Sequence, residues 1–275
     1  MSFKHIISRD NPIFKQLKKL ADNARERRAE AKTLLDGVHL IEAYCEAFGE
    51  PELAGLELII IPEGKSSLEA TNLMQTLADV NTIMLPTLMF AELTPVASST
   101  GILALVKVPT VAAPTSVEFA LMLEDIQDPG NLGSMLRTAL GAGVQVVYLS
   151  KGCTDAWSPK ALRGGQGAQF YIPIVEGVDL LEIMQNFAGN TYATTMTGES
   201  LYTQDLTKPS AFVIGNEGAG LSAKMISAAS QKISIPMHED LESLNAGAAA
   251  AVCLFERTRQ TAVLKTTVLE NSNKG

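Results

Sequence analysis

The sequence has few of the residues that build disulfide frameworks and metal centres. Its 275 residues include only three cysteines and three histidines. The cysteines (Cys45, Cys153 and Cys253) are odd in number and widely spaced, and the histidines do not have the spacing of metal ligands. We therefore expect free thiols, a cytoplasmic location and no metal site.

Long apolar runs are also absent from the sequence. The run LELIII is far shorter than the roughly 20 apolar residues of a membrane-spanning helix. The opening MSFKHIISRDNPIFK has neither the apolar stretch nor the cleavage site of a signal peptide, so neither a membrane location nor secretion is expected. A hydrophobic content of 46%, spread along the chain, indicates a folded protein of one large or two modest domains.

Basic residues are scarce over residues 33–108, although they are frequent in the opening segment. The net charge of −8 argues mildly against a nucleic-acid partner. However, residues 1–32 contain nine basic and four acidic residues, whereas residues 33–108 contain two basic and ten acidic residues. A basic opening segment on an acidic protein is consistent with a local phosphate contact, and equally with a solvated helix face.

The first third of the chain alternates between predicted helices and strands. Residues 11–37 begin with Asn-Pro, end with Gly and have apolar residues at helical spacing, which predicts one amphipathic helix. The runs ELIIIP, NTIMLP and GILALVKV predict strands, and residues 66–80 predict a helix with a serine cap. This pattern is typical of a small α/β sandwich with a mostly parallel sheet.

A stretch with two prolines, residues 106–116, is the best candidate for a linker. We therefore predict domains over residues 1–108 and 117–265, a linker over 109–116 and a tail over 266–275. In the second domain strands and helices alternate regularly, which predicts a parallel sheet with helices on both faces.

Three polar loops each follow a predicted strand of the second domain. They are DPGNLGSMLRTA, GNEGAGLS and PMHEDLESLNAG. Because ligands bind at the carboxyl ends of parallel strands, we expect these loops to share one crevice. The glycine-rich loop has neither the Walker nor the dinucleotide-binding spacing, and on its own it is consistent with a structural turn.

Several side chains in and near these loops have two readings. We place Asn131 in the loop and Arg137 on the following helix, where Arg137 needs either a phosphate or a carboxylate such as Glu217 or Asp125. His238 is expected to be a solvated loop histidine. Lys160 and Arg163, between Trp157 and Tyr171, fit either an RNA contact or a solvated edge.

Taken together and in this order, the three loops closely resemble the motifs of the SpoU (TrmH) family of RNA ribose 2′-O-methyltransferases, within the SPOUT superfamily. The motifs are DPGNLGSMLRTA, FVIGNEGAGLS, and ISIPM followed by ESLNAGAAAA, and the resemblance covers about residues 118–260. The opening SRDNPIFKQLKKL resembles, more weakly, the family's N-terminal substrate-binding domain, which is like a ribosomal protein.

The resemblance implies an α/β catalytic domain with a parallel sheet and a deep trefoil knot, a small N-terminal α/β RNA-binding domain, and a homodimer. It also implies S-adenosylmethionine as the methyl donor. The catalytic candidates carried over are Asn131, Arg137, Glu217, Ser243 and Asn245. The residues that would bind the donor are Thr194, Thr195, Met196, Gly198, Ile214, Gly215, Asn216, Gly218, Ile235, Pro236, Met237, Leu244, Asn245 and Ala246.

The implied reaction is attack of a ribose 2′-hydroxyl on the donor methyl group. Ser243 and Asn245 would face donor and ribose, while the alanine-rich helix behind them packs closely. Because a guanidinium does not normally lose its proton, Arg137 is expected to hold an RNA phosphate and to stabilise the developing alkoxide. Departures from the family's common pattern are the acidic HEDLE loop, Ala246-Gly247 after Ser-Leu-Asn, and Gly165, where a serine is frequent.

The substrate expected from the resemblance is ribosomal RNA, because of the N-terminal domain. The alternatives are 2′-O-methylation of transfer RNA, and a non-catalytic RNA-binding or ribosome-assembly protein that keeps the knot. A methyltransferase acting on a small molecule or a protein is a third reading. The acidic charge slightly favours it, and the basic opening segment disfavours it.

Overall fold

The computed structural model describes residues 3–49, 55–64, 66–94, 100–241 and 243–272, with side chains described as far as residue 262. Contacts divide the chain into two compact units. The first contains Met1–Thr110 and Asp155–Tyr171, and the second contains Val111–Thr154 and Ile172–Gly275. The segment Asp155–Tyr171 thus belongs to the first unit, although its place in the sequence suggested the second domain.

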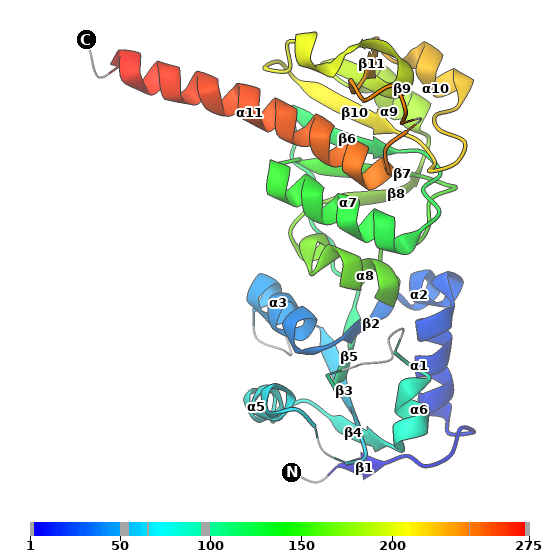
Figure 1. Ribbon diagram of the computed structural model, residues 1–275. Coiled ribbons are helices and arrows are strands. Elements are labelled where there is room, and N and C mark those ends of the chain that lie inside the picture. Colours follow the sequence, from blue (N-terminus) through cyan, green and yellow to red (C-terminus); the bar gives the residue numbers. More distant parts are fainter. Residues whose placement is uncertain (1–2, 50–54, 65, 95–99, 242, 273–275) are drawn as a thin grey trace. The chain divides into compact units, whose positions relative to one another are not determined.

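The first unit is a mixed sheet with helices on both faces (Figure 1). Its sheet has the order β1-β4-β3-β5-β2. Strand β5 runs antiparallel to β2 and β3, so the sheet is mixed, not mostly parallel as the sequence predicted. The strands are β1 (Lys4–His5), β2 (Lys32–Asp36), β3 (Leu56–Pro62), β4 (Thr82–Leu85) and β5 (Leu103–Lys107). The helices are α1 (Pro12–Asp22), α2 (Ala24–Glu30), α3 (Val38–Phe48), α5 (Leu68–Thr76), α6 (Thr87–Ala91), α8 (Pro159–Gly165) and the 3₁₀ helix η1 (Ala168–Phe170).

The single helix predicted over residues 11–37 is wrong. Asn23 ends α1 with its backbone N–H, and its side chain accepts a hydrogen bond from the backbone N–H of Arg25 to begin α2. Ala31 then adopts a left-handed conformation (φ 50°), which stops the second helix. The next residues enter β2, where Leu34 and Leu35 are buried on opposite faces of the sheet.

The segment Asp155–Tyr171 completes the first unit. Leu162 and Phe170 join the apolar core that α3 and α5 form on one face of the sheet. The Arg27 guanidinium donates to Asp155 at 2.6 Å, and both side chains are at least 95% buried. The hydroxyl of Thr33 donates to the carbonyl of Trp157 at 2.6 Å. These contacts make the segment part of this unit's interior.

The second unit is a parallel sheet of order β11-β9-β10-β6-β7-β8, as predicted. Helices α7 and α11 pack together on one face, and α9 packs with α10 on the other (Figure 1). The strands are β6 (Phe119–Leu123), β7 (Val146–Ser150), β8 (Ile174–Val178), β9 (Asn190–Ser200), β10 (Ser210–Ile214) and β11 (Gln231–Ser234). The helices are α7 (Pro129–Ala142), α9 (Leu180–Asn186), α10 (Ala223–Ala228), α11 (Ala246–Ser272) and the 3₁₀ helix η2 (Leu201–Thr203).

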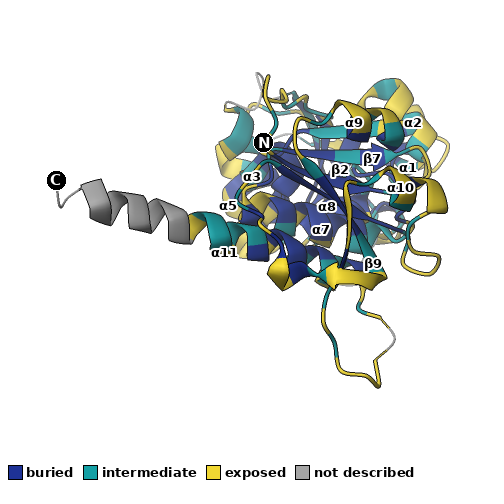
Figure 2. Cartoon of the chain, turned by 90° about the horizontal axis from the view of Figure 1, so that it is seen from above, coloured by how far each residue is buried: buried dark blue, intermediate teal, exposed yellow. Residues whose placement is uncertain are grey.

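The central strands β6 and β10 are buried along their whole length, and polar residues begin where they end. Figure 2 shows the same division for the chain as a whole, with buried strands inside and exposed residues in the peripheral loops and helices. Their continuous apolar sequences suit strands that are covered on both faces. Asp128 caps α7, and Pro129 occupies its first turn, where a missing N–H costs nothing. Helix α11 continues to Ser272, so most of the expected tail is helical.

Strand β9 is interrupted where it pairs with β11. Lys232 pairs with Ala193, but the next residue, Ile233, pairs with Glu199. Residues 194–198 therefore bow out of the ladder at the end of the sheet. A Cβ atom on Gly198 would lie 2.7 Å from the carbonyl oxygen of Lys232, so glycine is needed for the strands to rejoin.

Candidate active site

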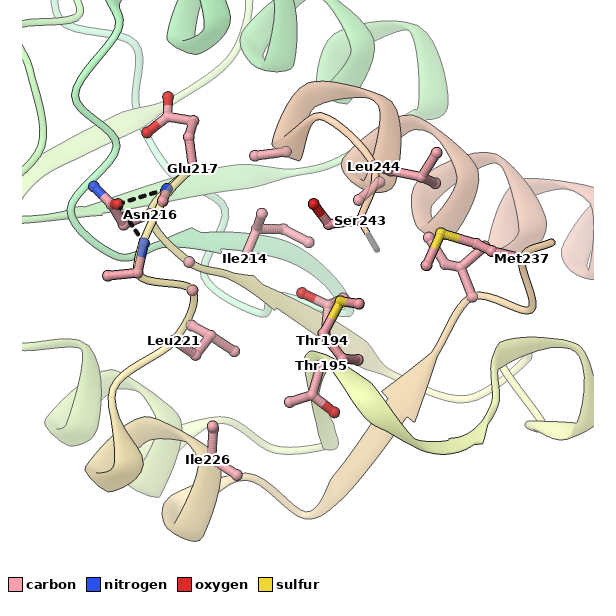
Figure 3. Close-up of a pocket in the computed structure, with 18 residues that line it drawn as sticks. Thr194, Thr195, Ile214, Asn216, Glu217, Leu221, Ile226, Met237, Ser243 and Leu244 are labelled. Atoms are coloured by element: carbon pink, nitrogen blue, oxygen red, sulfur yellow. Dashed lines mark hydrogen bonds between the residues drawn. The ribbon is translucent and has the colours of Figure 1, made fainter. Parts of the chain in front are cut away.

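A cavity of about 470 Å³ lies at the carboxyl ends of β9, β10 and β11 in the second unit. Figure 3 shows Thr194, Thr195, Ile214 and Ser243 around this space, with Met237 at one side. The walls combine apolar side chains with backbone from a glycine-rich loop. The lining residues are Thr194, Thr195, Met196, Ile214, Gly215, Asn216, Glu217, Gly218, Ala219, Gly220, Leu221, Ile226, Ile235, Met237, Ser243, Leu244, Ala246 and Ala249.

Most residues expected to bind a donor come together in this cavity. Those that line it are Thr194, Thr195, Met196, Ile214, Gly215, Asn216, Gly218, Ile235, Met237, Leu244 and Ala246. Gly198, Pro236 and Asn245 are not among the lining residues. Of the catalytic candidates, Glu217 and Ser243 line the cavity.

The glycine-rich loop is held by Asn216. Its side-chain oxygen accepts hydrogen bonds from the backbone N–H groups of Gly218 and Ala219, both at 2.9 Å (Figure 3). Its side-chain amide donates to the carbonyl of Asp125 at 2.8 Å. A Cβ atom on Gly215 would lie 2.3 Å from the backbone of Gly220, so the loop can close only with glycine there. Asn216 thus shapes the wall of the cavity.

Glu217 begins a hydrogen-bond network that links all three motifs. The side-chain amide of Asn131 donates to its carboxylate at 3.2 Å. Asn131 in turn accepts a hydrogen bond from the side-chain amide of Asn245 at 3.3 Å. The backbone N–H groups of Gln127 and Asp128 also donate to Glu217, at 3.3 and 3.4 Å. In Figure 3 the carboxylate points away from the two threonines of the cavity.

The pKa of Glu217 is lowered from its ordinary value of 4.5. Burial acts to raise this pKa, but hydrogen bonds from the residue's own backbone N–H, from Asn131 and from the backbone of Gln127 and Asp128 outweigh it. Glu217 is therefore anionic near neutral pH. A carboxylate with a lowered pKa is a poor proton acceptor, so its chemistry is to orient neighbouring groups.

The side chain of Asn245 has two structural roles at the start of the apolar helix α11. Its side-chain oxygen accepts hydrogen bonds from the backbone N–H groups of Gly247 and Ala248, at 2.9 and 3.2 Å, which caps α11. The other end of the same amide donates to Asn131. One side chain therefore both starts α11 and joins it to the start of α7. Ser243, which is exposed, remains available at the cavity.

Asn131 and Arg137 both lie on α7, so the expected loop position of Asn131 is wrong. It is the third residue of the helix, and its N–H is capped by Asp128 at 2.8 Å. Arg137 is exposed two turns later. Among the described residues Arg137 has no ion pair or hydrogen bond, so it contacts neither Glu217 nor Asp125. Its fork is free for an external anion.

Other candidate groups lie outside this network. His238 is exposed and contacts Asp240 at 3.4 Å. Lys160 and Arg163 are exposed on α8, in the first unit. No group of three potential metal ligands is found in the described part of the chain, nor any helix there long and apolar enough to cross a membrane.

Five residues that line the cavity are not among the predicted donor-binding or catalytic residues: Ala219, Gly220, Leu221, Ile226 and Ala249. Ala219, Gly220 and Leu221 lie inside the glycine-rich motif itself. Ile226 lines the cavity from α10, outside the three motifs, and Ala249 lines it from α11, within the third motif. Apolar helix residues of this kind carry no sequence signal that separates them from core.

The fold and the cavity define a class: a parallel α/β protein with a small-molecule site beside a polar network at the carboxyl ends of its strands. The model of the SpoU rRNA methylase family matches residues 118–255, about half of the chain. The chain belongs to this family.

Relatives with named activities match most of the chain. It is 30% identical over 259 residues to the 23S rRNA (guanosine(2553)-2′-O)-methyltransferase RlmP of Bacillus subtilis, covering 92% of this chain and 98% of that one. It is 30% identical to the 23S rRNA (guanosine-2′-O-)-methyltransferase RlmB of Photorhabdus laumondii, over 82% of this chain and 98% of that one. The SpoU methyltransferase AviRb of Streptomyces viridochromogenes, solved with AdoMet, is similar in structure, with a TM-score of 0.79, 26% identity, and coverage of 91% and 98%.

Proposed function

We propose that this protein methylates a ribose 2′-hydroxyl of ribosomal RNA with S-adenosylmethionine. Membership of the SpoU family and the named activities of its relatives support this reaction. The observation that carries it is the convergence of three motifs on one cavity, through the hydrogen bonds from Asn245 to Asn131 to Glu217. Both relatives are named as methyltransferases of guanosines in 23S rRNA, which supports ribosomal over transfer RNA.

The cavity fits S-adenosylmethionine. Its volume of about 470 Å³ lies within the range of small-molecule sites, about 300–1,000 Å³. Apolar side chains such as Ile214, Leu221 and Leu244 suit the adenine ring, and the polar groups of Thr194 and Thr195 suit ribose and amino-acid groups. When bound, the donor supplies an electrophilic methyl group on a positively charged sulfur, which needs no further activation.

The protein's own residues then position the hydroxyl. Arg137 binds the RNA phosphate next to the target ribose and stabilises negative charge on the 2′ oxygen. Ser243 lies at the cavity and contacts the ribose. Glu217 and Asn131 fix the start of α7, and Asn245 fixes the start of α11 against it. The reaction forms the bond from the 2′ oxygen to the methyl carbon, breaks the methyl–sulfur bond and releases the hydroxyl proton to water.

Further features belong to the same proposal. We propose a deep trefoil knot in the C-terminal catalytic domain (residues 117–265), an N-terminal RNA-binding domain like a ribosomal protein (residues 1–108), and a homodimer. The free cysteines of the described chain support a cytoplasmic location. In the first unit, the exposed Lys4, Lys19, Arg25 and Arg28 of the basic opening segment, and Arg163 on α8, are among the basic residues available for RNA.

The test is transfer of labelled methyl groups from S-adenosylmethionine to ribosomal RNA, followed by mapping of 2′-O-methylation.

Arg137→Lys keeps the charge but loses the planar guanidinium group. It should lower kcat by about 10²-fold, because bidentate binding of the phosphate is lost. Lys208→Ala is the matched control, since Lys208 is an exposed cation of the same unit paired with Asp205. Donor binding without any methyl transfer would indicate the non-catalytic alternative.

A further inference from the structure

A second cavity, of about 270 Å³, lies in the second unit at the carboxyl ends of β6, β7 and β8. It has no role in the reaction described above. Its polar lining includes Glu124, Asp125, Asp179, Lys151 and Lys224. Leu180 and Met225, both buried, give it apolar walls. The volume is below the usual range for a whole cofactor, about 300–1,000 Å³, and suits a single ring system.

The second cavity shares a wall with the donor cavity. The loop from Gly215 to Leu221 lines the donor cavity, and the next residue, Ser222, lines the second. Two hydrogen bonds fix this wall to the end of β6. Ser222 donates its backbone N–H to Glu124 at 2.7 Å, and Asn216 donates to the carbonyl of Asp125 at 2.8 Å. An RNA segment with one ribose at the donor cavity therefore has this pocket within reach of a neighbouring group.

The charged groups of this pocket are only partly satisfied by the protein. Glu124 accepts one hydrogen bond from Ser222, Asp125 one from the hydroxyl of Ser150 at 2.7 Å, and Asp179 one from the backbone of Leu181 at 2.9 Å. Each interaction uses a single carboxylate oxygen, so the other oxygens can accept more. Lys151 and Lys224 are exposed, and neither has an ion pair or hydrogen bond within the described residues.

These groups select the kind of ligand. A phosphate would meet three carboxylates against two ammonium groups, so it would be repelled. A purely apolar group would bury charges without compensation. A nucleobase fits, because its faces are apolar and its edges carry both donors and acceptors, and RNA-binding proteins commonly read unstacked bases in this way.

The arrangement favours one base. Guanine has two adjacent donors, N1–H and the N2 amino group, which match a carboxylate, and two acceptors, O6 and N7, which accept from lysine. Adenine has no N1–H donor, and neither pyrimidine has two adjacent N–H donors that match a carboxylate. We infer that this cavity binds a guanine of the RNA segment that carries the methylated ribose. The inference rests on the proposed function and adds the base to it.

The first experiment measures binding of mononucleotides to the full-length, S-adenosylmethionine-saturated protein by ligand-observed NMR. Guanosine monophosphate should bind about tenfold more tightly than inosine monophosphate, which lacks the N2 amino group and so loses one hydrogen bond to a charged acceptor. Adenosine monophosphate should bind more weakly still. Competition by inorganic phosphate equal to that by guanosine monophosphate would show a phosphate site and overturn the inference.

Variants of the two lysines that line the second cavity test whether guanosine monophosphate binds there. Lys151→Met and Lys224→Met keep the aliphatic stem and should each weaken binding of guanosine monophosphate by about fivefold or more, through loss of a charged donor. Lys232→Met, an exposed lysine on β11 that does not line the cavity, is the matched control. In RNA methylation the two variants should raise KM with kcat and donor binding unchanged. The same values as for Lys232→Met would refute the inference, whereas a wild-type protein that methylates no RNA would refute the proposed function instead.

Discussion

The basic opening segment of the first unit and the cavities of the second unit differ in how their charged side chains are held. In the first unit, five of the nine cations of the basic opening segment are held by carboxylates within the unit. In the second unit, the carboxylate at the centre of the site, Glu217, is held only by neutral amide groups. The cations Arg137, Lys151 and Lys224 of that unit have no partner among the described residues. The ion pairs are Arg9–Glu92, Lys15–Asp10, Lys18–Asp22, Arg27–Asp155 and Lys32–Glu57.

The difference teaches where to look for function in this protein. A cation that is paired with a carboxylate of the same unit has a structural role. When the pair is buried, loss of one partner strongly destabilises the fold, whereas an exposed pair contributes little to stability. A cation left without one, beside a cavity, is available to a ligand. The high positive charge of residues 1–32 therefore overstates the surface that RNA can use, and the acidic second unit has more free cations near its cavities than its net charge suggests.

The largest effect should come from breaking the buried pair of the first unit. Arg27→Met leaves the carboxylate of Asp155 buried without a cation, although it still accepts the backbone N–H of Trp157, and also removes the guanidinium that donates to the carbonyl of Leu20. We expect a loss of about 3–5 kcal/mol in the free energy of unfolding. Urea unfolding followed by circular dichroism measures it.

The matched control for this change is Lys15→Ala, which breaks the exposed pair with Asp10. Its cost should be about 0–1 kcal/mol, because water screens both partners. Equal losses for the two variants would remove the distinction between buried and exposed pairs on which the comparison depends.

The next effect should appear in activity rather than stability. Asn131→Ala removes the donor to Glu217 and the acceptor for Asn245, so the starts of α7 and α11 lose their mutual alignment. We expect kcat for RNA methylation to fall by about 10²-fold, since misplacement by about 1 Å is enough for this. Donor affinity, measured by calorimetry, should change little because Asn131 does not line the cavity.

Asn186→Ala tests the same substitution elsewhere in the second unit. Asn186 is exposed at the end of α9, where its amide donates to the carbonyl of Glu182. Its activity should equal that of the wild type. Full activity of Asn131→Ala would mean that the network is only structural.

The order of strands and helices in the second unit could be predicted from sequence, because apolar runs and glycine or proline boundaries are local signals. The three motifs also predicted most of the cavity. The sequence could not show that the side chain of Asn245 caps α11 and donates to Asn131. Nor could it show that the side chain of Asn216 holds the glycine-rich loop by hydrogen bonds to Gly218 and Asp125. Those roles depend on which groups meet in three dimensions.

Nor could sequence order assign α8 to the first unit. Its residues lie between β7 and β8, so continuity along the chain placed them in the second domain. The deciding contacts, Arg27 with Asp155 and Leu162 with the core around Tyr44, join residues more than a hundred positions apart. The helix predicted over residues 11–37 was too long for a related reason. Its helical spacing ended at Ala24, and the strand after it, β2, is defined by pairing with the distant β5.

A smaller effect should follow from the family departure at Gly165. A Cβ atom there would lie 2.2 Å from the side-chain oxygen of Gln169, which is fully buried. Gly165→Ser should therefore cost about 1–3 kcal/mol in unfolding free energy. In a Gln169→Ala background the same change should cost less, by about 1 kcal/mol, because the clash is gone.

Gly141→Ala provides the control for Gly165→Ser. Its added Cβ would meet only the ring of Phe255, at an ordinary 3.8 Å. Within α7 it should be neutral or stabilising by about 0.5–1 kcal/mol. Equal costs at Gly165 in both backgrounds would show that Gln169 is not what excludes a side chain there.

The smallest effect is the pH dependence that Glu217 contributes. Its pKa in the folded protein lies below the ordinary 4.5, because hydrogen bonds from its own backbone N–H, Asn131, Gln127 and Asp128 outweigh burial. A carboxyl whose pKa is lowered by folding stabilises the fold above pH 4.5 and loses that contribution as the pH falls through the folded value. Urea midpoints of the wild type and Glu217→Gln should therefore differ by a constant amount near neutral pH and converge only below pH 4.5. Convergence at higher pH would show that the amide groups do not hold Glu217 ionised. The contrast between Glu217, held by neutral groups, and the ion pairs of the first unit would then be wrong.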